Sequence, residues 1–192
     1  MTPAVFLDRD GTMIREAHYL SRREDLHWFP ATIDMIRLLN RAGYLVFVTT
    51  NQGGIGLGLY DETFVVETHQ EMDATIRAGG GHVDGWFYCP HHPNAVIDDL
   101  RLDCECRKPR TGMIERARAA HAIDLARSFV VGDKLNDVRM AEAVGATGIL
   151  VRTGHGADIA ERQRDALPAG TRIASDLAEA TMWMIDAREA TR

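Results

Sequence analysis

Two carboxylates lie within three residues of each other in the string FLDRDGT, which covers residues 6–12. Asp8 and Asp10 repel one another at this separation unless a cation or a proton lies between them, and Gly11 permits a sharp turn. A third carboxylate, Asp133 in the string GDKLND, offers the oxygen ligands that Mg²⁺ prefers. The simpler alternative is that Asp8 and Asp10 are only turn and helix-capping residues.

A hydroxyl group and an ammonium group accompany these carboxylates. Thr50 lies in the string TTNQ, and Lys108 lies in the string CRKP. A nucleophilic carboxylate, a metal-binding carboxylate, a hydroxyl and an ammonium are the groups required to hold and transfer a phosphoryl group. Because Thr50, Lys108 and Asp133 each follow a different predicted strand, the combination favours phosphoryl transfer over a set of turn residues.

The three cysteines of the chain form a second candidate site. Cys89-x-His91 and, twelve residues further on, Cys104-x-Cys106 supply a Cys₃His set, a common composition for zinc. Four protein ligands leave no position for water, so the predicted zinc is structural rather than catalytic. His92 is an alternative to His91 as the fourth ligand. Inert buried thiols and a nucleophilic cysteine are the other interpretations, and two tight pairs in a polar loop disfavour both.

Alternating strands and helices must position these residues. Continuous apolar or β-branched runs predict buried strands, and helical periodicity between start and stop signals predicts helices. The predicted strands are residues 4–8, 44–51, 83–89, 128–133 and 147–154. The predicted helices are residues 30–43 starting at Pro30, 61–81 capped by Asp61, 112–123 and 136–146, followed by a helix, the short run TRIASD and a C-terminal helix. This order indicates an α/β fold with a doubly wound parallel sheet, in which ligands bind beyond the carboxyl ends of the strands.

Length, charge and cysteine content limit the classes of protein to consider. A chain of 192 residues with 45% apolar content predicts one domain over residues 1–192, with the zinc-binding loop 89–106 inserted in it. The net charge of −6 argues against binding to nucleic acid. The sequence contains no long apolar run, so no membrane span is predicted. With no signal peptide and an odd number of cysteines, we expect a cytoplasmic protein.

The motifs LDRDGT, TTNQ, the lysine of CRKP and GDKLND occur in an order that resembles the haloacid dehalogenase superfamily of phosphohydrolases. The narrower combination DRDGT, TNQ, CPHHP, CxCRKP and GDK resembles the D-glycero-D-manno-heptose-1,7-bisphosphate phosphatases and the related histidinol-phosphate phosphatases. The resemblance covers residues 3–155 and implies the Rossmann-like haloacid dehalogenase core, with short loops in place of a large cap domain. The chain departs from the usual TNQSGIARG, since Gly53 replaces a serine and Leu57 replaces an arginine.

The resemblance implies a role for each motif residue. Asp8 would attack phosphorus and form an aspartyl-phosphate. Asp10 would protonate the leaving alcohol and then activate the water that hydrolyses the intermediate. Thr50 and Lys108 would stabilise the transferred group, with Asp137 as the acid that orients Lys108.

The resemblance also implies two metal sites. A catalytic Mg²⁺ would be held by Asp8, the backbone carbonyl of Asp10 and Asp133. The family's use of the first histidine favours His91 over His92 for zinc. The implied zinc ligands are therefore Cys89, His91, Cys104 and Cys106.

The implied substrate is a phosphorylated sugar, D-glycero-D-manno-heptose 1,7-bisphosphate, from which the 7-phosphate is removed to leave the 1-phosphate. The sequence leaves the anomer open. The residues predicted to bind this substrate are Glu16, Tyr19, Asn51, Gln52, Arg107 and Lys134. The product would serve lipopolysaccharide or another heptose-containing glycan, and we expect the protein to be a monomer.

Three other functions compete with this one. A monofunctional histidinol-phosphate phosphatase carries similar motifs. A receiver-type signalling module shares a doubly wound sheet, paired acids, a threonine and a lysine, but its phosphorylated aspartate follows a middle strand of the chain. Here Asp8 follows the first strand and has Asp10 two residues on, which favours turnover. A nucleic-acid-binding protein with a structural zinc is disfavoured by the acidic net charge and the 7% aromatic content.

Overall fold

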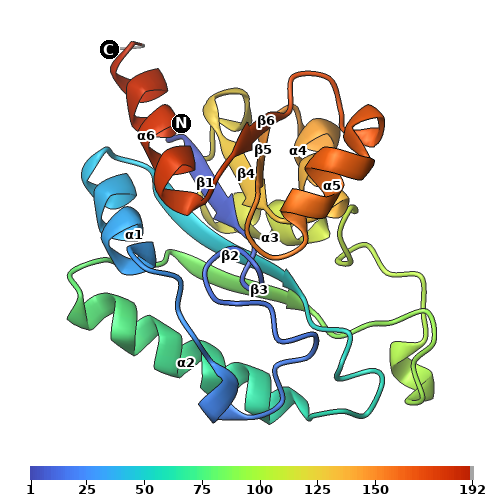
Figure 1. The fold of residues 1–192 in the computed structure, drawn as a ribbon. Coiled ribbons are helices and arrows are strands. Elements are labelled where there is room, and N and C mark those ends of the chain that lie inside the picture. The colour runs from blue at the N-terminus through green and yellow to red at the C-terminus, as the bar shows by residue number, and fades with distance from the viewer. Residues whose placement is uncertain (191–192) are drawn as a thin grey trace.

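Six parallel strands form one sheet in the computed structural model, which describes residues 1–190 (Figure 1). The strands lie in the order β3-β2-β1-β4-β5-β6, and every neighbouring pair is parallel. Their bounds are β1 Ala4–Leu7, β2 Leu45–Asn51, β3 Gly85–Cys89, β4 Phe129–Gly132, β5 Thr147–Val151 and β6 Arg172–Ala174. The helices are α1 Thr32–Arg41, α2 Glu62–Ala78, α3 Gly112–Ala120, α4 Leu135–Val144, α5 Gly156–Arg162 and α6 Leu177–Glu189. The predicted doubly wound parallel sheet is confirmed.

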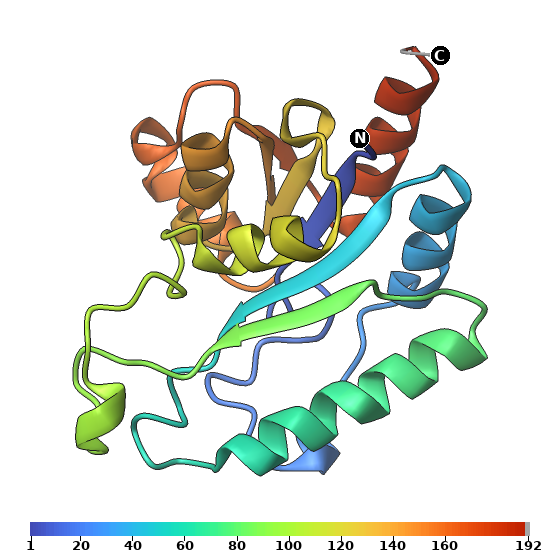
Figure 2. The same cartoon turned by 180° about the vertical axis from the view of Figure 1, so that it is seen from behind.

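Helices cover both faces of this sheet (Figure 2). Val5 and Leu7 of β1 belong to an apolar cluster with residues of α1, α2 and α6. Ala4 and Phe6 of the same strand belong to a second cluster with residues of α3 and α4. All four side chains are buried, which explains the continuous apolar run instead of an alternating one. Each large apolar side chain buried in this way contributes about 1.5–3 kcal/mol to stability.

The strand order reverses beside β1. From β1 the chain adds β2 and β3 on one side, and it then crosses back to place β4, β5 and β6 on the other side. The carboxyl ends of β1 and β4 therefore form a topological switch point, where open α/β sheets bind ligands. Asp8 follows β1 and Asp133 follows β4, so the topology brings these two carboxylates together.

The sequence predicts the start of α2 correctly and the start of α1 incorrectly. Asp61 accepts a hydrogen bond from the backbone N–H of Phe64 at 2.7 Å, which confirms it as the cap of α2. The predicted start of the first helix at Pro30 is wrong, because α1 begins at Thr32. The intervening Ala31 has a left-handed backbone, with φ at 65°, which is incompatible with a helical turn at that residue.

The short run TRIASD contains the sixth strand, which the sequence did not assign. Its three strand residues pair in parallel with Ile149, Leu150 and Val151 of β5. Three residues are too few for a periodic pattern, so only the pairing with β5 distinguishes this strand from a loop.

The connections that follow β1 and β3 are loops rather than folded units (Figure 1). Within residues 1–190 they contain only single-turn 3₁₀ helices, at Arg23–Asp25 and Asp98–Leu100, so no cap domain covers the strand ends in this part of the chain. No described helix combines the length and apolar character needed to cross a membrane. The last two residues of the predicted 1–192 domain lie outside the described residues.

Candidate active site

Two donors hold Asp8 at the carboxyl end of β1. The side chain is buried, and the backbone N–H of Arg9 donates to its Oδ1 at 2.7 Å. The ammonium nitrogen of Lys108 lies 2.9 Å from the same oxygen. Because both donors contact Oδ1, they fix the orientation of the carboxylate and leave its other oxygen without either contact.

The ammonium group of Lys108 joins two carboxylates. Besides Asp8, its Nζ lies 2.6 Å from Oδ1 of Asp137 and donates to the backbone carbonyl of Thr49 at 2.9 Å. Two carboxylate oxygens and one carbonyl oxygen therefore surround the ammonium group. Burial acts to lower the pKa of Lys108, but Asp137 and Asp8 outweigh it and raise the pKa, so the group is charged. This contact agrees with the predicted orienting role of Asp137.

Asn51 fixes the backbone of Lys108 from the end of β2. The N–H of Lys108 donates to Asn51 Oδ1 at 3.0 Å, and Asn51 Nδ2 donates to the Lys108 carbonyl at 3.3 Å. The amide thus supports the lysine with both of its polar ends. Asn51 also lines the cavity at the site, where we predicted a substrate contact.

Asp133 supplies the ligand atoms that a cation at this site would need. Oxygens of Asp8, Asp133 and Asp137 lie within 4.8 Å of one another. Oδ1 of Asp133 is buried and has no hydrogen-bond partner among residues 1–190. Burial, with the charge of Asp8, raises the pKa of Asp133 to about 8. Gly11 and Gly154 make room for this carboxylate, since a Cβ on either would lie 2.2 Å from its Oδ2. Oδ2 of Asp133 accepts from the backbone N–H of His155 at 2.8 Å, so Oδ1 is the unsatisfied atom, and such an oxygen among other carboxylates fits Mg²⁺.

Asp10 is bound by its neighbour Arg9. Nε and Nη2 of the guanidinium donate to the two oxygens of Asp10 at 3.1 Å each. Burial acts to raise the pKa of Asp10, but Arg9, Lys134 and Gln52 together shift it below its usual value. The carboxyl group is therefore ionised in this arrangement, and it must take up a proton before it can serve as an acid.

Gln52 joins Thr50 to Asp10. Its Nε2 donates to Thr50 Oγ1 at 2.9 Å and to Asp10 Oδ2 at 3.0 Å. Gln52 is itself buried and does not line the cavity between these groups, so it lies behind the residues that face a substrate. That cavity has a volume of about 40 Å³ and is lined by Asp8, Asp10, Thr50, Asn51, Lys108, Lys134, Asn136 and Asp137.

The four predicted zinc ligands lie together. Cys89 Sγ is 3.5 Å from both His91 Nδ1 and Cys104 Sγ. Cys106 Sγ is 3.3 Å from His91 Nδ1 and 3.5 Å from Cys104 Sγ. Tetrahedral zinc with ordinary bond lengths separates its ligand atoms by about 3.5–3.8 Å, so these four side chains fit that metal.

His92, the alternative zinc ligand, lies outside this cluster. Its Nδ1 accepts a hydrogen bond from the backbone of Asn94 at 3.1 Å. Its ring lies against Gly53, where an added Cβ would be 2.9 Å from His92 Cδ2 and 3.1 Å from Arg107 Nη1. The glycine that replaces the family's serine therefore gives both side chains room.

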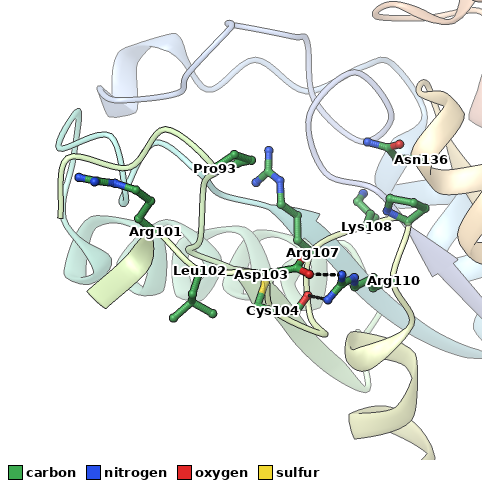
Figure 3. A pocket seen from close by; sticks show the side chains of 10 residues that line it. Pro93, Arg101, Leu102, Asp103, Cys104, Arg107, Lys108, Arg110 and Asn136 are labelled. Carbon is green, nitrogen blue, oxygen red and sulfur yellow. Dashed lines mark hydrogen bonds and ion pairs between the residues drawn. The ribbon is translucent and has the colours of Figure 1, made fainter. Parts of the chain in front are cut away.

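A larger cavity of about 510 Å³ adjoins the small one, and Lys108 and Asn136 line both (Figure 3). Figure 3 shows Arg101, Arg107 and Arg110 of the loop after β3 around this cavity, with Asn136 of α4. Arg107 Nη1 donates to the carbonyl of His91 at 2.7 Å. The lining carries the positive charges of Arg101, Arg107, Lys108 and Arg110 next to the buried carboxylates, and Arg110 is paired with Asp103 of the same lining.

Of the remaining predicted substrate residues, some lie at the small cavity and others do not. Lys134 lines the small cavity and its Nζ lies 2.7 Å from Glu16, which also lies 3.5 Å from His155 Nε2. Tyr19 is exposed and lines neither of the two cavities described above. Arg9 and Asn136 were not among the predicted site residues, although they lie inside the motifs LDRDGT and GDKLND, and that position was the available signal.

Comparisons with known proteins agree with this geometry. The sequence profile of the HAD-hydrolase-like family matches residues 105–180. D-glycero-beta-D-manno-heptose-1,7-bisphosphate 7-phosphatase from Rhodopseudomonas palustris is 42% identical over 146 residues, covering 76% of this chain and 81% of that one. The enzyme of the same name from Escherichia coli K12 is 40% identical over 153 residues, covering 79% and 80%.

Solved structures give the same result. D,D-heptose 1,7-bisphosphate phosphatase from B. bronchiseptica, complexed with magnesium and phosphate, superimposes with a TM-score of 0.85 at 31% identity, covering 96% of this chain and 98% of that one. The corresponding phosphatase from Burkholderia thailandensis gives 0.71 at 31% identity, covering 95% and 98%. The family resemblance read from the motifs is therefore confirmed. Sequence identity over most of both chains, together with the shared fold, shows that this protein belongs to the heptose-1,7-bisphosphate 7-phosphatase family of haloacid dehalogenase-like hydrolases.

Proposed function

We propose that this protein removes the 7-phosphate of D-glycero-D-manno-heptose 1,7-bisphosphate through an aspartyl-phosphate on Asp8. The observation that carries the proposal is the buried array in which Lys108 joins Asp8 to Asp137 beside the unsatisfied Oδ1 of Asp133. Such an array suits the transfer of a phosphoryl group to a carboxylate. The proposed sugar is taken from the names of the relatives, which also make the β anomer the first to assay.

In the first step, the Asp8 oxygen that Lys108 does not hold attacks the 7-phosphorus, and the bond from phosphorus to the sugar oxygen breaks. Lys108 and the hydroxyl of Thr50 stabilise the charge on the phosphoryl oxygens. Asp10, after taking up a proton, gives it to the departing sugar oxygen. In the second step, Asp10 accepts a proton from water, which attacks the aspartyl-phosphate and releases phosphate.

Two metal ions complete the proposal. Mg²⁺ held by Asp8, Asp133 and the backbone carbonyl of Asp10 would neutralise phosphoryl oxygens, so that an anionic carboxylate can approach them. The magnesium and phosphate in the solved relative support this assignment. The Cys₃His set would hold structural Zn²⁺ and restrain the loop 89–106, which ends two residues before Lys108.

The larger cavity would take the 1-phosphate and part of the sugar. Arg107 is its basic residue next to Lys108 in the chain, and Asn136 lines the boundary with the small cavity. We further infer a cytoplasmic monomer that serves the synthesis of lipopolysaccharide or another heptose-containing glycan. Sedimentation of the purified protein tests whether it is a monomer in solution.

The mechanism is tested by replacing Asp8 with asparagine. Asp8→Asn keeps the shape of the side chain but removes the nucleophile, so we expect hydrolysis of the heptose bisphosphate to fall at least about a thousandfold. Zinc content and thermal unfolding of the same sample report whether the fold is intact. Retained turnover in a folded, zinc-loaded Asp8→Asn protein would refute the covalent mechanism.

The substrate is tested by comparing kcat/KM across a panel. The panel holds both anomers of the heptose bisphosphate, fructose bisphosphate and histidinol phosphate. We expect the highest value for a heptose bisphosphate, because histidinol phosphate has no second phosphate for the basic cavity. A higher value for histidinol phosphate would leave the phosphatase chemistry in place and overturn the sugar.

A further inference from the structure

Arg9 is a charged side chain enclosed by protein, with only 1% of its surface exposed. Its guanidinium donates from Nε and Nη2 to the two oxygens of Asp10, and Nη2 also donates to Gln52 Oε1 at 3.0 Å. Nη1 lies 3.3 Å from Nε2 of His69. A buried arginine is costly unless its donors are paired, and here each of the three nitrogen atoms has a partner.

His69 provides an acceptor for this arginine from α2. Arginine carries only donors, so the His69 Nε2 that faces it must accept, and the ring proton lies on Nδ1. Burial, with the charge of Arg9, lowers the pKa of His69 to about 3, so the ring stays neutral. The ring is stacked on Trp86 of β3 at a centroid distance of 4.9 Å and an interplanar angle of 27°. The Nε2 acceptor of His69 is therefore held in place by Trp86 of the edge strand β3 as well as by α2.

Gln52 closes the network on the other side of Arg9. Its Oε1 accepts from both Arg9 Nη2 and the hydroxyl of Tyr60, each at 3.0 Å. These two donors determine which end of the amide faces Arg9, so Nε2 must donate to Asp10 and Thr50. Three directed hydrogen bonds, two from Arg9 and one from Gln52, thus act on one carboxyl group.

Different groups hold the two catalytic carboxylates. Asp8 is held by Lys108 and by the backbone N–H of Arg9, whereas the guanidinium of Arg9 is directed at Asp10. Asp10 is held by the guanidinium of Arg9, which His69 and Gln52 hold in turn. Loss of the guanidinium should therefore disturb proton transfer to the leaving group and leave the nucleophile in place.

We propose that Arg9, anchored by His69, is a positioning residue that fixes Asp10 where it can protonate the leaving alcohol. The proposal rests on the proposed function, in which Asp10 is the general acid. A sugar oxygen leaves as an alkoxide unless it receives a proton, whereas p-nitrophenolate leaves readily without one. The positioning of the acid should therefore affect hydrolysis of the sugar phosphate much more than hydrolysis of p-nitrophenyl phosphate.

The test compares kcat/KM for the heptose bisphosphate with kcat/KM for aryl phosphates of increasingly basic leaving groups. The value of kcat/KM reflects the steps up to and including departure of the leaving group, so the later attack of water does not affect it. The magnesium- and zinc-loaded protein is used in excess over substrate, which makes slow hydrolysis measurable. The variants are Arg9→Met, Arg9→Lys, His69→Phe and His69→Gln, with Arg77→Met as the control from the exposed side of α2.

For Arg9→Met we expect kcat/KM for the heptose bisphosphate to fall about a hundredfold or more, and that for p-nitrophenyl phosphate to fall less than about threefold. Arg9→Lys should recover part of the loss. His69→Phe should show the same selectivity at about tenfold, and His69→Gln, which retains an acceptor, should lie close to the wild type. Arg77→Met should alter neither value. A partly unfolded sample lowers both values equally, so the ratio reports on the folded molecules.

Equal losses on all esters in Arg9→Met would overturn the positioning role. The Asp10→Asn variant separates this failure from failure of the proposed function. If Asp10→Asn loses activity selectively on basic leaving groups and Arg9→Met does not, Asp10 is the acid and Arg9 does not position it. If Asp10→Asn shows no selectivity, Asp10 is not the acid, and both proposals fail.

Discussion

The ammonium of Lys108 is enclosed together with Asp8 and Asp137, within hydrogen-bond distance of both. Removing a charge from water is costly, and the cost is offset here by two ion pairs and a backbone carbonyl. The same arrangement supplies a fixed positive charge beside the proposed nucleophile. At the scale of the residue, stability and the proposed catalysis therefore depend on the same three groups.

This dependence predicts different effects of single and double substitutions. Lys108→Met leaves the two carboxylates uncompensated, so we expect the free energy of unfolding to fall by about 3 kcal/mol. Adding Asp137→Asn removes one of those charges and should restore part of that stability, while neither variant regains activity. Denaturant unfolding measured without added Mg²⁺ tests this. A double variant no more stable than Lys108→Met would show that the charges are not the source of the loss.

At the scale of the element, β3 leads directly into the predicted zinc loop. Cys89 is the last residue of β3 and is paired in register with Asn51 of β2. Asn51 in turn holds the backbone of Lys108, two residues beyond Cys106. The loop 89–106 is thus fixed at both ends, by the sheet at one end and by the cluster and Asn51 at the other. Its conformation should determine where Lys108 and Arg107 lie.

Loss of zinc should therefore lower activity without unfolding the sheet. In Cys104→Ser we expect the metal content to fall from about one zinc per chain and kcat/KM to fall about a hundredfold, the cost of a small misplacement at a catalytic site. Far-ultraviolet circular dichroism should change little, because the strands and helices do not contain Cys104. His92→Asn is the matched control and should keep its zinc. A Cys104→Ser protein with full metal content would refute the ligand set.

At the scale of the whole molecule, the neutral His69 makes global stability depend on pH. An exposed imidazole in the unfolded chain takes up a proton near pH 6.5, whereas folding lowers the pKa of His69 to about 3. Between these values the unfolded chain binds more protons, so stability is lost as the pH falls below about 6.5. From pH 7 to pH 5 this one group should cost the folded protein about 2 kcal/mol.

The comparison of wild type with His69→Gln isolates this contribution. Glutamine does not titrate, so the free energy of unfolding of the variant should fall less steeply over the same pH range. Denaturant unfolding of both zinc-loaded proteins at pH 7, 6 and 5 gives the difference. Parallel curves for the two proteins would show that His69 does not carry the pH dependence.

Short-range patterns account for what could be predicted from the sequence. The apolar runs predicted five of the six strands, and each motif lay after a strand, so the meeting of Asp8, Asp133 and Lys108 followed from topology. The network of Arg9 could not be predicted, because His69 lies 60 residues away and its contact depends on how α2 packs. The choice between His91 and His92 likewise depends on which side chain is directed toward the cysteines. Because the two residues are adjacent and identical, the sequence does not reveal this.

The loop between the two ends of the cysteine cluster has a consequence for how this enzyme can change. Pro93, Arg101, Leu102 and Asp103 of this loop line the larger cavity, yet the residues that hold Lys108 lie outside the span 93–103. Substitutions or changes of length there can reshape the part of the cavity that contacts the far end of a substrate while the chemical step stays intact. Such a division lets new substrates evolve without rebuilding the catalyst, and it marks residues 93–103 as the segment to randomise when a different sugar phosphate is wanted.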